Sequence, residues 1–154
     1  MRKAVVAAAL FVGLCLAGNV FAESATKEEC VAKCKEAAQL VIDKGIDAAI
    51  AEINKKDGPF VWKDSYVFMM DLEGTMLAHP ISPSLIGKNL LETPDKGPDR
   101  KLLFKEFVEL AKSKGEGWVD YMWPKPGEKT PSKKLSYIYR VPGKDVFVAA
   151  GVYE

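Results

Sequence analysis

The stretch YVFMMDLEGTMLAHP, residues 66–80, decides the fold expected of this chain. It holds two runs of mainly apolar and aromatic residues, 66–71 and 75–79, on either side of a short connection that contains Gly74. A glycine at such a position can adopt positive φ, so the pattern predicts a β-hairpin. Because strands joined by a hairpin are antiparallel, the stretch predicts an antiparallel sheet at the centre of the domain.

The residues before the hairpin predict a helical segment over 26–56. Thr26 can cap its first turn, which also carries two glutamates, and apolar residues recur at spacings of three and four. Gly45 is unfavourable inside a helix, and we expect it to divide the segment into a long helix and a shorter one. The pair Gly58-Pro59 ends the segment.

The residues after the hairpin predict a long loop, one helix and three more strands. The loop, 80–98, is rich in proline and glycine and follows His79, the only histidine of the chain. An apolar stripe predicts a helix over 99–114, with Gly115 as its stop. The strands are expected at 117–123, 134–141 and 145–153. This order predicts an α+β domain: an antiparallel sheet of about five strands with a long N-terminal helix and a second helix packed beside it.

The N-terminus has the pattern of a cleavable export signal. Arg2 and Lys3 precede an apolar run over 4–16, and Val20-Phe21-Ala22 offers small residues for a signal peptidase. The apolar run is too short for a comfortable membrane span. We therefore expect residues 1–22 to be a signal peptide and the mature chain to be periplasmic or secreted.

Residues 23–154 are expected to form one mature domain, with 23–57 as its N-terminal helical segment. The net charge of the whole chain is +1, and removal of the two basic residues of the signal leaves it close to neutral. Near neutrality argues against nucleic acid as the main partner, and no later stretch predicts a membrane span. We expect no output domain after the last predicted strand, so the chain is expected to act alone or through a partner.

Two cysteines, Cys30 and Cys34, remain after the expected cleavage. Four residues apart on a helix, they lie on one face at about 6 Å, near the upper end of the range for a disulfide. A strained bridge within the helix, a bridge between two chains and two small core residues are comparable alternatives. Two thiols alone make a poor zinc site.

No catalytic motif is present: the sequence lacks a nucleophile elbow, a phosphate-binding loop and paired histidines for a metal. We expect no enzymatic activity and no cofactor. Strand alternation instead predicts a sheet face rich in aromatic residues with a few cations. Such a face can bury a small organic ligand, and an ammonium, tyrosine hydroxyls and an imidazole can hold a carboxylate. Plain core packing explains the same aromatic residues equally well.

The segment from Gly58 to Tyr153 resembles the single Cache domain family of PAS-like extracytoplasmic sensor modules. The resemblance rests on GPFVWKDSYVFMMDLEGTMLAHP, LIGKNL and DKG, followed by GWVDYMWPKP, KKLSY and a closing GVY. It implies a ligand pocket between the sheet and the 80–98 loop, with short carboxylates as ligands. The pocket positions that it implies are Trp62, Tyr66, Phe68, Met70, His79, Pro80, Tyr121, Trp123, Lys134 and Tyr137.

Within that set, Lys134, Tyr121 and His79 are expected to hold the carboxylate, while the aromatic residues and Met70 enclose the carbon chain. The loop would become ordered over the ligand. The sequence thus predicts a periplasmic, non-enzymatic sensor or binding protein for a short-chain carboxylate, which passes its signal to a membrane receptor or kinase in chemotaxis. The alternative is a structural or interaction protein with a vestigial pocket, acting through its N-terminal helix, which is also a candidate surface for a homodimer.

Overall fold

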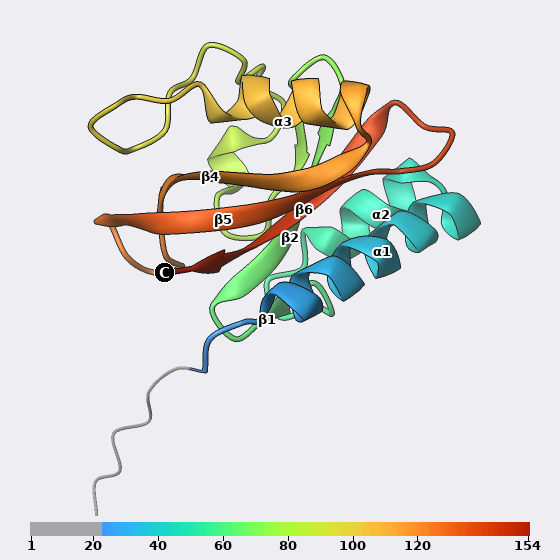
Figure 1. The fold of residues 1–154 in the computed structure, drawn as a ribbon. Coiled ribbons are helices and arrows are strands. Elements are labelled where there is room, and N and C mark those ends of the chain that lie inside the picture. The colour runs from blue at the N-terminus through green and yellow to red at the C-terminus, as the bar shows by residue number, and fades with distance from the viewer. Residues whose placement is uncertain (1–22) are drawn as a thin grey trace, which may run out of the picture.

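A computed structural model describes residues 23–154, so the predicted signal peptide lies outside the described residues. A central antiparallel sheet has helices on both faces (Figure 1). The elements in chain order are α1 (Lys27–Lys44), α2 (Ile46–Ile53), β1 (Val61–Trp62), β2 (Ser65–Asp71), β3 (Met76–Ala78), the 3-10 helix η1 (Pro83–Leu85), α3 (Leu103–Ser113), β4 (Glu116–Pro124), β5 (Pro131–Arg140) and β6 (Val146–Tyr153).

The predicted hairpin is present as β2 and β3. The two strands are antiparallel, and their register shifts between Met69 and Met70. Gly74 has φ +88°, and a Cβ at this position would overlap the side chain of Leu91. The turn therefore needs glycine both for its backbone conformation and for its space.

Within residues 23–154 the sheet has six strands rather than about five, in the order β1-β2-β6-β5-β4, with β3 also paired to β2. The additional strand is β1, which pairs with the start of β2 through Val61 and Trp62. Two residues are too few to give a periodic signal, so the sequence predicts no strand at Trp62.

The N-terminal helical segment divides at Gly45, as predicted. Gly45 has φ +90° and separates α1 from α2. Thr26 caps α1 through a full capping box: its side chain accepts from the Glu29 N–H, and the Glu29 carboxylate accepts from the Thr26 N–H.

The second long helix, α3, begins at Leu103 rather than at residue 99. Arg100 has φ +50°, and the N–H of Lys101 is bound to the Asp95 side chain, so these residues belong to the preceding loop. In Figure 1, α3 lies on one side of the sheet and α1 with α2 on the other. We call these two sides of the sheet the α3 face and the α1 face.

Each face has its own core. On the α1 face, side chains of α1 and α2 such as Ala37 and Val41 pack on strand residues such as Val67 and Val148. On the α3 face the core is dominated by aromatic residues, among them Tyr66, Phe68, Phe104, Phe107, Tyr121, Trp123 and Phe147. No helix within residues 23–154 combines the length and apolar character that crossing a membrane requires.

Both cysteines of α1 are free and fully buried on the α1 face. The Cys34 Sγ lies 3.9 Å from the carbonyl oxygen of Tyr137, and the Cys30 Sγ lies 3.9 Å from Ser65 Oγ. Burial raises the pKa of Cys30 to about 11 and that of Cys34 well above its ordinary value. In this structure both cysteines are free thiols that pack as small core residues, and the candidate disulfide stays a prediction.

Candidate functional site

Lys134 lies in β5, between β6 and β4 in the sheet, and points into the α3 face. Its neighbours across the register are Tyr121 in β4 and Tyr153 in β6. The residue is 0% exposed, and its Nζ has no hydrogen-bond partner. The Nζ lies 4.1 Å from the ring centre of Tyr66 and 4.9 Å from that of Tyr153. Ring faces attract a cation but do not replace an anion or a hydrogen-bond acceptor.

A glycine in the neighbouring strand makes room for this side chain. Gly151 faces Ser136 across β5 and β6, and a Cβ on Gly151 would lie 2.8 Å from the Lys134 Cε. Ser136 is also buried and shares a 2.8 Å hydrogen bond with the Tyr121 hydroxyl. The lysine stem and two hydroxyl groups thus fill a gap that an ordinary strand residue would close.

The lysine is charged and the tyrosines around it are neutral. Burial acts to lower the pKa of Lys134, and the oxygens of Tyr121, Tyr66 and Tyr153 act in the opposite direction. Burial raises the pKa values of Tyr121 and Tyr153. The group therefore presents one cation with protonated hydroxyl groups nearby, which is the complement of a carboxylate.

His79 is 3% exposed and lies beside the same rings, with its own ring centre 4.9 Å from Tyr66 and 5.8 Å from Phe68. Burial and the positive charge of Lys134 lower the pKa of His79 to about 3. The neutral ring accepts the Ser82 N–H at Nδ1, at 2.9 Å, so its proton is on Nε2. His79 can thus donate a hydrogen bond without adding charge.

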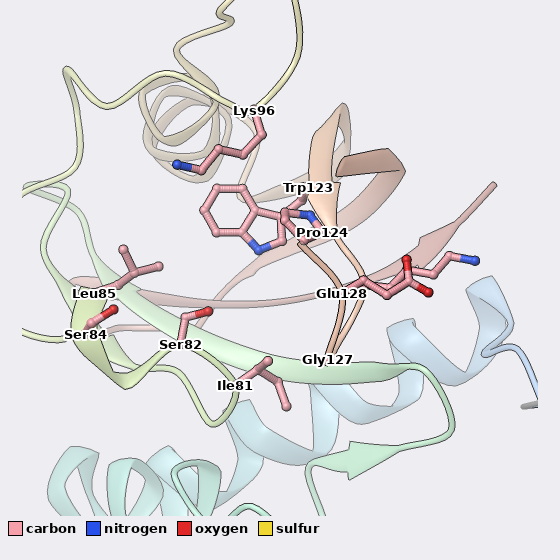
Figure 2. Close-up of a pocket in the computed structure, with 10 residues that line it drawn as sticks. Ile81, Ser82, Ser84, Leu85, Lys96, Trp123, Pro124, Gly127 and Glu128 are labelled. Carbon is pink, nitrogen blue, oxygen red and sulfur yellow. The ribbon is translucent and has the colours of Figure 1, made fainter. Parts of the chain in front are cut away.

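These side chains border two spaces. A cavity of about 10 Å³, which we call the inner cavity, is lined by Tyr66, Phe68, Met76, His79, Leu103, Phe104, Phe107, Tyr121 and Trp123. This is about the volume that a single water needs. Next to it an outer cleft of about 350 Å³ lies between the segment after His79 and the end of β4 (Figure 2). Ser82, Lys96, Trp123 and Glu128 are among its lining residues.

The 80–98 loop is held at several points rather than free. Near its middle, Asn89 bridges to Thr75, and the Gly87 N–H donates to the Met76 carbonyl. Near its end, the buried Asp95 carboxylate accepts the backbone N–H groups of Gly97 and Lys101, and that of Met122 in β4. Only local hydrogen bonds hold η1, next to the cleft. The idea that the whole loop orders on binding is therefore too broad, because most of it is already anchored.

Most of the predicted site residues come together. Tyr66, Phe68, His79, Tyr121 and Trp123 line the inner cavity, and Lys134 lies behind Tyr66 and Tyr121. Met70 is buried on the same face but does not line the cavity, and Pro80 is buried next to His79.

Two predicted residues lie elsewhere. Trp62 and Tyr137 pack in the core of the α1 face, and the Tyr137 hydroxyl donates to the Glu116 carboxylate. Tyr137 is three residues from Lys134, an odd spacing that puts the two side chains on opposite faces of a strand.

The sequence analysis does not predict three neighbours of Lys134 as site residues: Ser136, Gly151 and Tyr153. Ser136 has the same parity as Lys134 in β5, and this signal could have been used. Gly151 and Tyr153 lie beside Lys134 because of the register of β6 against β5. The sequence alone does not determine this register. No cluster of metal-ligating side chains occurs among residues 23–154.

The fold defines a class: a PAS-like α+β domain with an antiparallel sheet between helices. A family model described as Cache domain matches residues 34–154. The chain belongs to the Cache domain family, as the resemblance implied.

One relative is the methyl-accepting chemotaxis protein McpP of Pseudomonas putida, which is 38% identical over 90 residues. The match covers 58% of this chain and only 16% of the receptor, so the chain corresponds to a small part of that protein.

Two solved structures match more of the chain. The periplasmic sensor domain of a chemotaxis protein is 30% identical with a TM-score of 0.65, and the match covers 82% of this chain and 88% of that one. A Cache chemosensory domain that recognises a carboxylic acid is 31% identical with a TM-score of 0.64, covering 82% and 86%. The relatives are thus extracytoplasmic sensor domains of chemotaxis proteins, a non-enzymatic kind of domain.

Proposed function

We propose that this protein is an exported, non-enzymatic sensor or binding domain for a short-chain carboxylic acid, whose carboxylate pairs with Lys134. The observation that carries the proposal is the buried Lys134 ammonium, which has no hydrogen-bond partner. An unpaired buried charge costs several kcal/mol. A bound anion would remove that cost, so the free protein is prepared for a negatively charged ligand.

The groups around Lys134 specify which anion fits. Tyr121 and His79 line the inner cavity, and the Tyr121 hydroxyl and the His79 Nε2–H are neutral groups that can donate a hydrogen bond. They can share the two oxygens of one carboxylate with the ammonium. The remaining walls, among them Phe68, Phe104 and Phe107, are apolar rings that suit a short carbon chain.

Binding requires some movement because the inner cavity holds about 10 Å³. The segment 81–86 borders the outer cleft and is held by the His79–Ser82 hydrogen bond and by packing of Ile81, Leu85 and Ile86 on the α3-face core. A small displacement of this segment is the movement that leaves the anchored parts of the loop in place. The likeness to a solved domain that recognises a carboxylic acid supports the same ligand class.

The test compares acids with neutral molecules of the same shape. Thermal unfolding would be followed with acetate, propionate, lactate and pyruvate, and with propionamide and propanol as matched neutral controls. An acid at one hundred times its Kd stabilises the fold by about 2.7 kcal/mol, while the neutral controls give no shift. Equal shifts with propionate and propionamide, or no shift with any acid, would contradict the proposal.

Export and signalling complete the proposal. Residues 1–22 act as the signal peptide, and residues 23–154 are the binding domain, whose occupancy is read by a membrane chemoreceptor or kinase. The pattern of Arg2 and Lys3 before an apolar run supports export. Sequencing the N-terminus of protein from the periplasmic fraction should give Glu23 as the first residue, and an uncleaved N-terminus would contradict it.

The exposed face of α1 is the candidate surface for a homodimer. Ile42 is 47% exposed, more than any other large hydrophobic residue among those described. Ile42→Glu should shift the chain from dimer to monomer in sedimentation experiments, with acid binding unchanged. If Ile42→Glu abolished signalling while pocket variants had no effect, the protein would act as an interaction module with a vestigial pocket.

A further inference from the structure

Trp123 has a position that the proposed binding mode leaves unexplained. Within residues 23–154, it is the one residue that lines both the inner cavity and the outer cleft. Every other residue around the two spaces borders only one of them. The indole is therefore the partition between a space of about 10 Å³ and one of about 350 Å³.

The partition is held firmly on its inner side. The indole meets Phe104 edge to face at 6.0 Å between ring centres, and it meets Tyr121 at 6.3 Å. It is 9% exposed, so the cleft reaches only a small part of it. Figure 2 shows the indole between the Lys96 side chain and the segment that carries Ser82.

The space beyond the partition suits the tail of a longer acid. Ile81, Leu85 and Pro124 provide apolar surface there, and the rest of the lining is mainly polar, with Ser82, Ser84, Lys96, Lys125 and Glu128. Lys134, which is proposed to hold the carboxylate, lies beside Tyr66 and Tyr121, and the Tyr121 ring lies 6.3 Å from that of Trp123. A ligand held between Lys134 and the cavity rings would therefore have Trp123 as a neighbour.

We propose that Trp123 determines specificity by setting the longest carbon chain that the site accepts, and that the outer cleft is the space which the indole closes off. This inference rests on the proposed function, because it takes Lys134 as the point where the carboxylate binds. The inference adds a steric limit to the proposed function. Because burial of each further methylene favours binding, a site can reject longer acids only if a rigid side chain blocks their carbon chain.

The test measures the dissociation constants of acetate, propionate, butyrate and hexanoate by calorimetry for the wild type and Trp123→Ala. In the wild type, affinity should fall beyond three carbons. In Trp123→Ala the two spaces join, so affinity should rise about fourfold for each added methylene. Trp118→Ala is the matched control, because Trp118 is in the same strand, is 36% exposed and lies on the α1 face. It should keep the wild-type order of acids.

Trp123→Phe keeps a ring against Phe104 and covers the case in which the alanine variant does not fold. It should show an intermediate preference. If folded Trp123 variants keep the wild-type order of acids, the inference is overturned while the proposed function stands. If neither the wild type nor any variant binds an acid, the proposed function itself fails.

Discussion

The two faces of the sheet are built from the same strands but have different chemistry. On the α1 face, helices cover small and aliphatic side chains, and even the thiols of Cys30 and Cys34 behave as core atoms. On the α3 face, one helix and a long loop cover a layer of aromatic rings that contains a lysine, a serine and a histidine.

The difference is clearest in the polar atoms that each face leaves without a partner. Among buried side-chain atoms of the described residues, these are the indole N–H of Trp62 on the α1 face and the ammonium of Lys134 on the α3 face. A neutral unpaired donor costs about 1–3 kcal/mol, whereas an unpaired buried charge costs more. Both faces stabilise the fold through their cores, but the α3 face also keeps an unpaired charge, a cost that the proposed binding of an acid explains.

The largest expected effect comes from removing one phenylalanine on each face. Phe60 on the α1 face is 2% exposed and Phe68 on the α3 face is 3% exposed. Either change to alanine should lower the free energy of unfolding by about 3–5 kcal/mol. Only Phe68→Ala should also weaken acid binding, because Phe68 lines the inner cavity. Equal loss of affinity in both variants would remove the functional distinction between the faces.

The next effect concerns the loop that closes the α3 face. Asp95→Ala removes the acceptor of three backbone N–H groups, those of Gly97, Lys101 and Met122. We expect a loss of about 2–4 kcal/mol in urea unfolding and faster hydrogen exchange at Met122. Asp99→Ala, an exposed neighbour in the same loop, is the control and should change stability little. A similar small change in both variants would show that Asp95 does not anchor the loop.

These polar anchors also mark the limit of what the sequence predicts. The hairpin, the division at Gly45 and the aromatic face follow from local turn chemistry and from strand alternation, which act over a few residues. The role of Asp95 does not, because its partners are up to 27 residues away. Gly151 likewise needs the register of β6 against β5 before its space for Lys134 can be recognised. Alternation does separate Tyr137 from Lys134, so that placement could have been predicted.

A smaller effect is the pH dependence that His79 gives to the α3 face. Its pKa is about 3 when folded and near 6.5 when unfolded. The unfolded chain therefore binds the proton first, and stability is complete above pH 6.5 and falls below it. Between pH 7.5 and pH 5 the loss should be about 2 kcal/mol.

His79→Asn tests this directly, because it keeps an acceptor for the Ser82 N–H but does not titrate. His79 is the only histidine of the chain, so the loss over this pH range should disappear in the variant. An equal loss in both proteins would assign the pH dependence to other groups.

The last prediction concerns the reactivity of the two thiols on the α1 face, where we expect no reaction in the native protein. Because Cys30 and Cys34 are 0% exposed and their pKa values are raised, they should not react with a thiol reagent in the native protein. Both should react once the chain is unfolded in urea without a reductant. Failure to react after unfolding would show that a disulfide is present.

The most direct test of the central claim compares two adjacent lysines. Lys134 is buried without a partner, while Lys133 is exposed and pairs with Glu154 at 2.8 Å. Without acid, Lys134→Met should be at least as stable as the wild type in urea unfolding, because an apolar side chain replaces an unpaired buried charge. With propionate at one hundred times the wild-type Kd, the wild type and Lys133→Met should gain about 2.7 kcal/mol and Lys134→Met nothing. An undiminished gain in Lys134→Met would contradict the account.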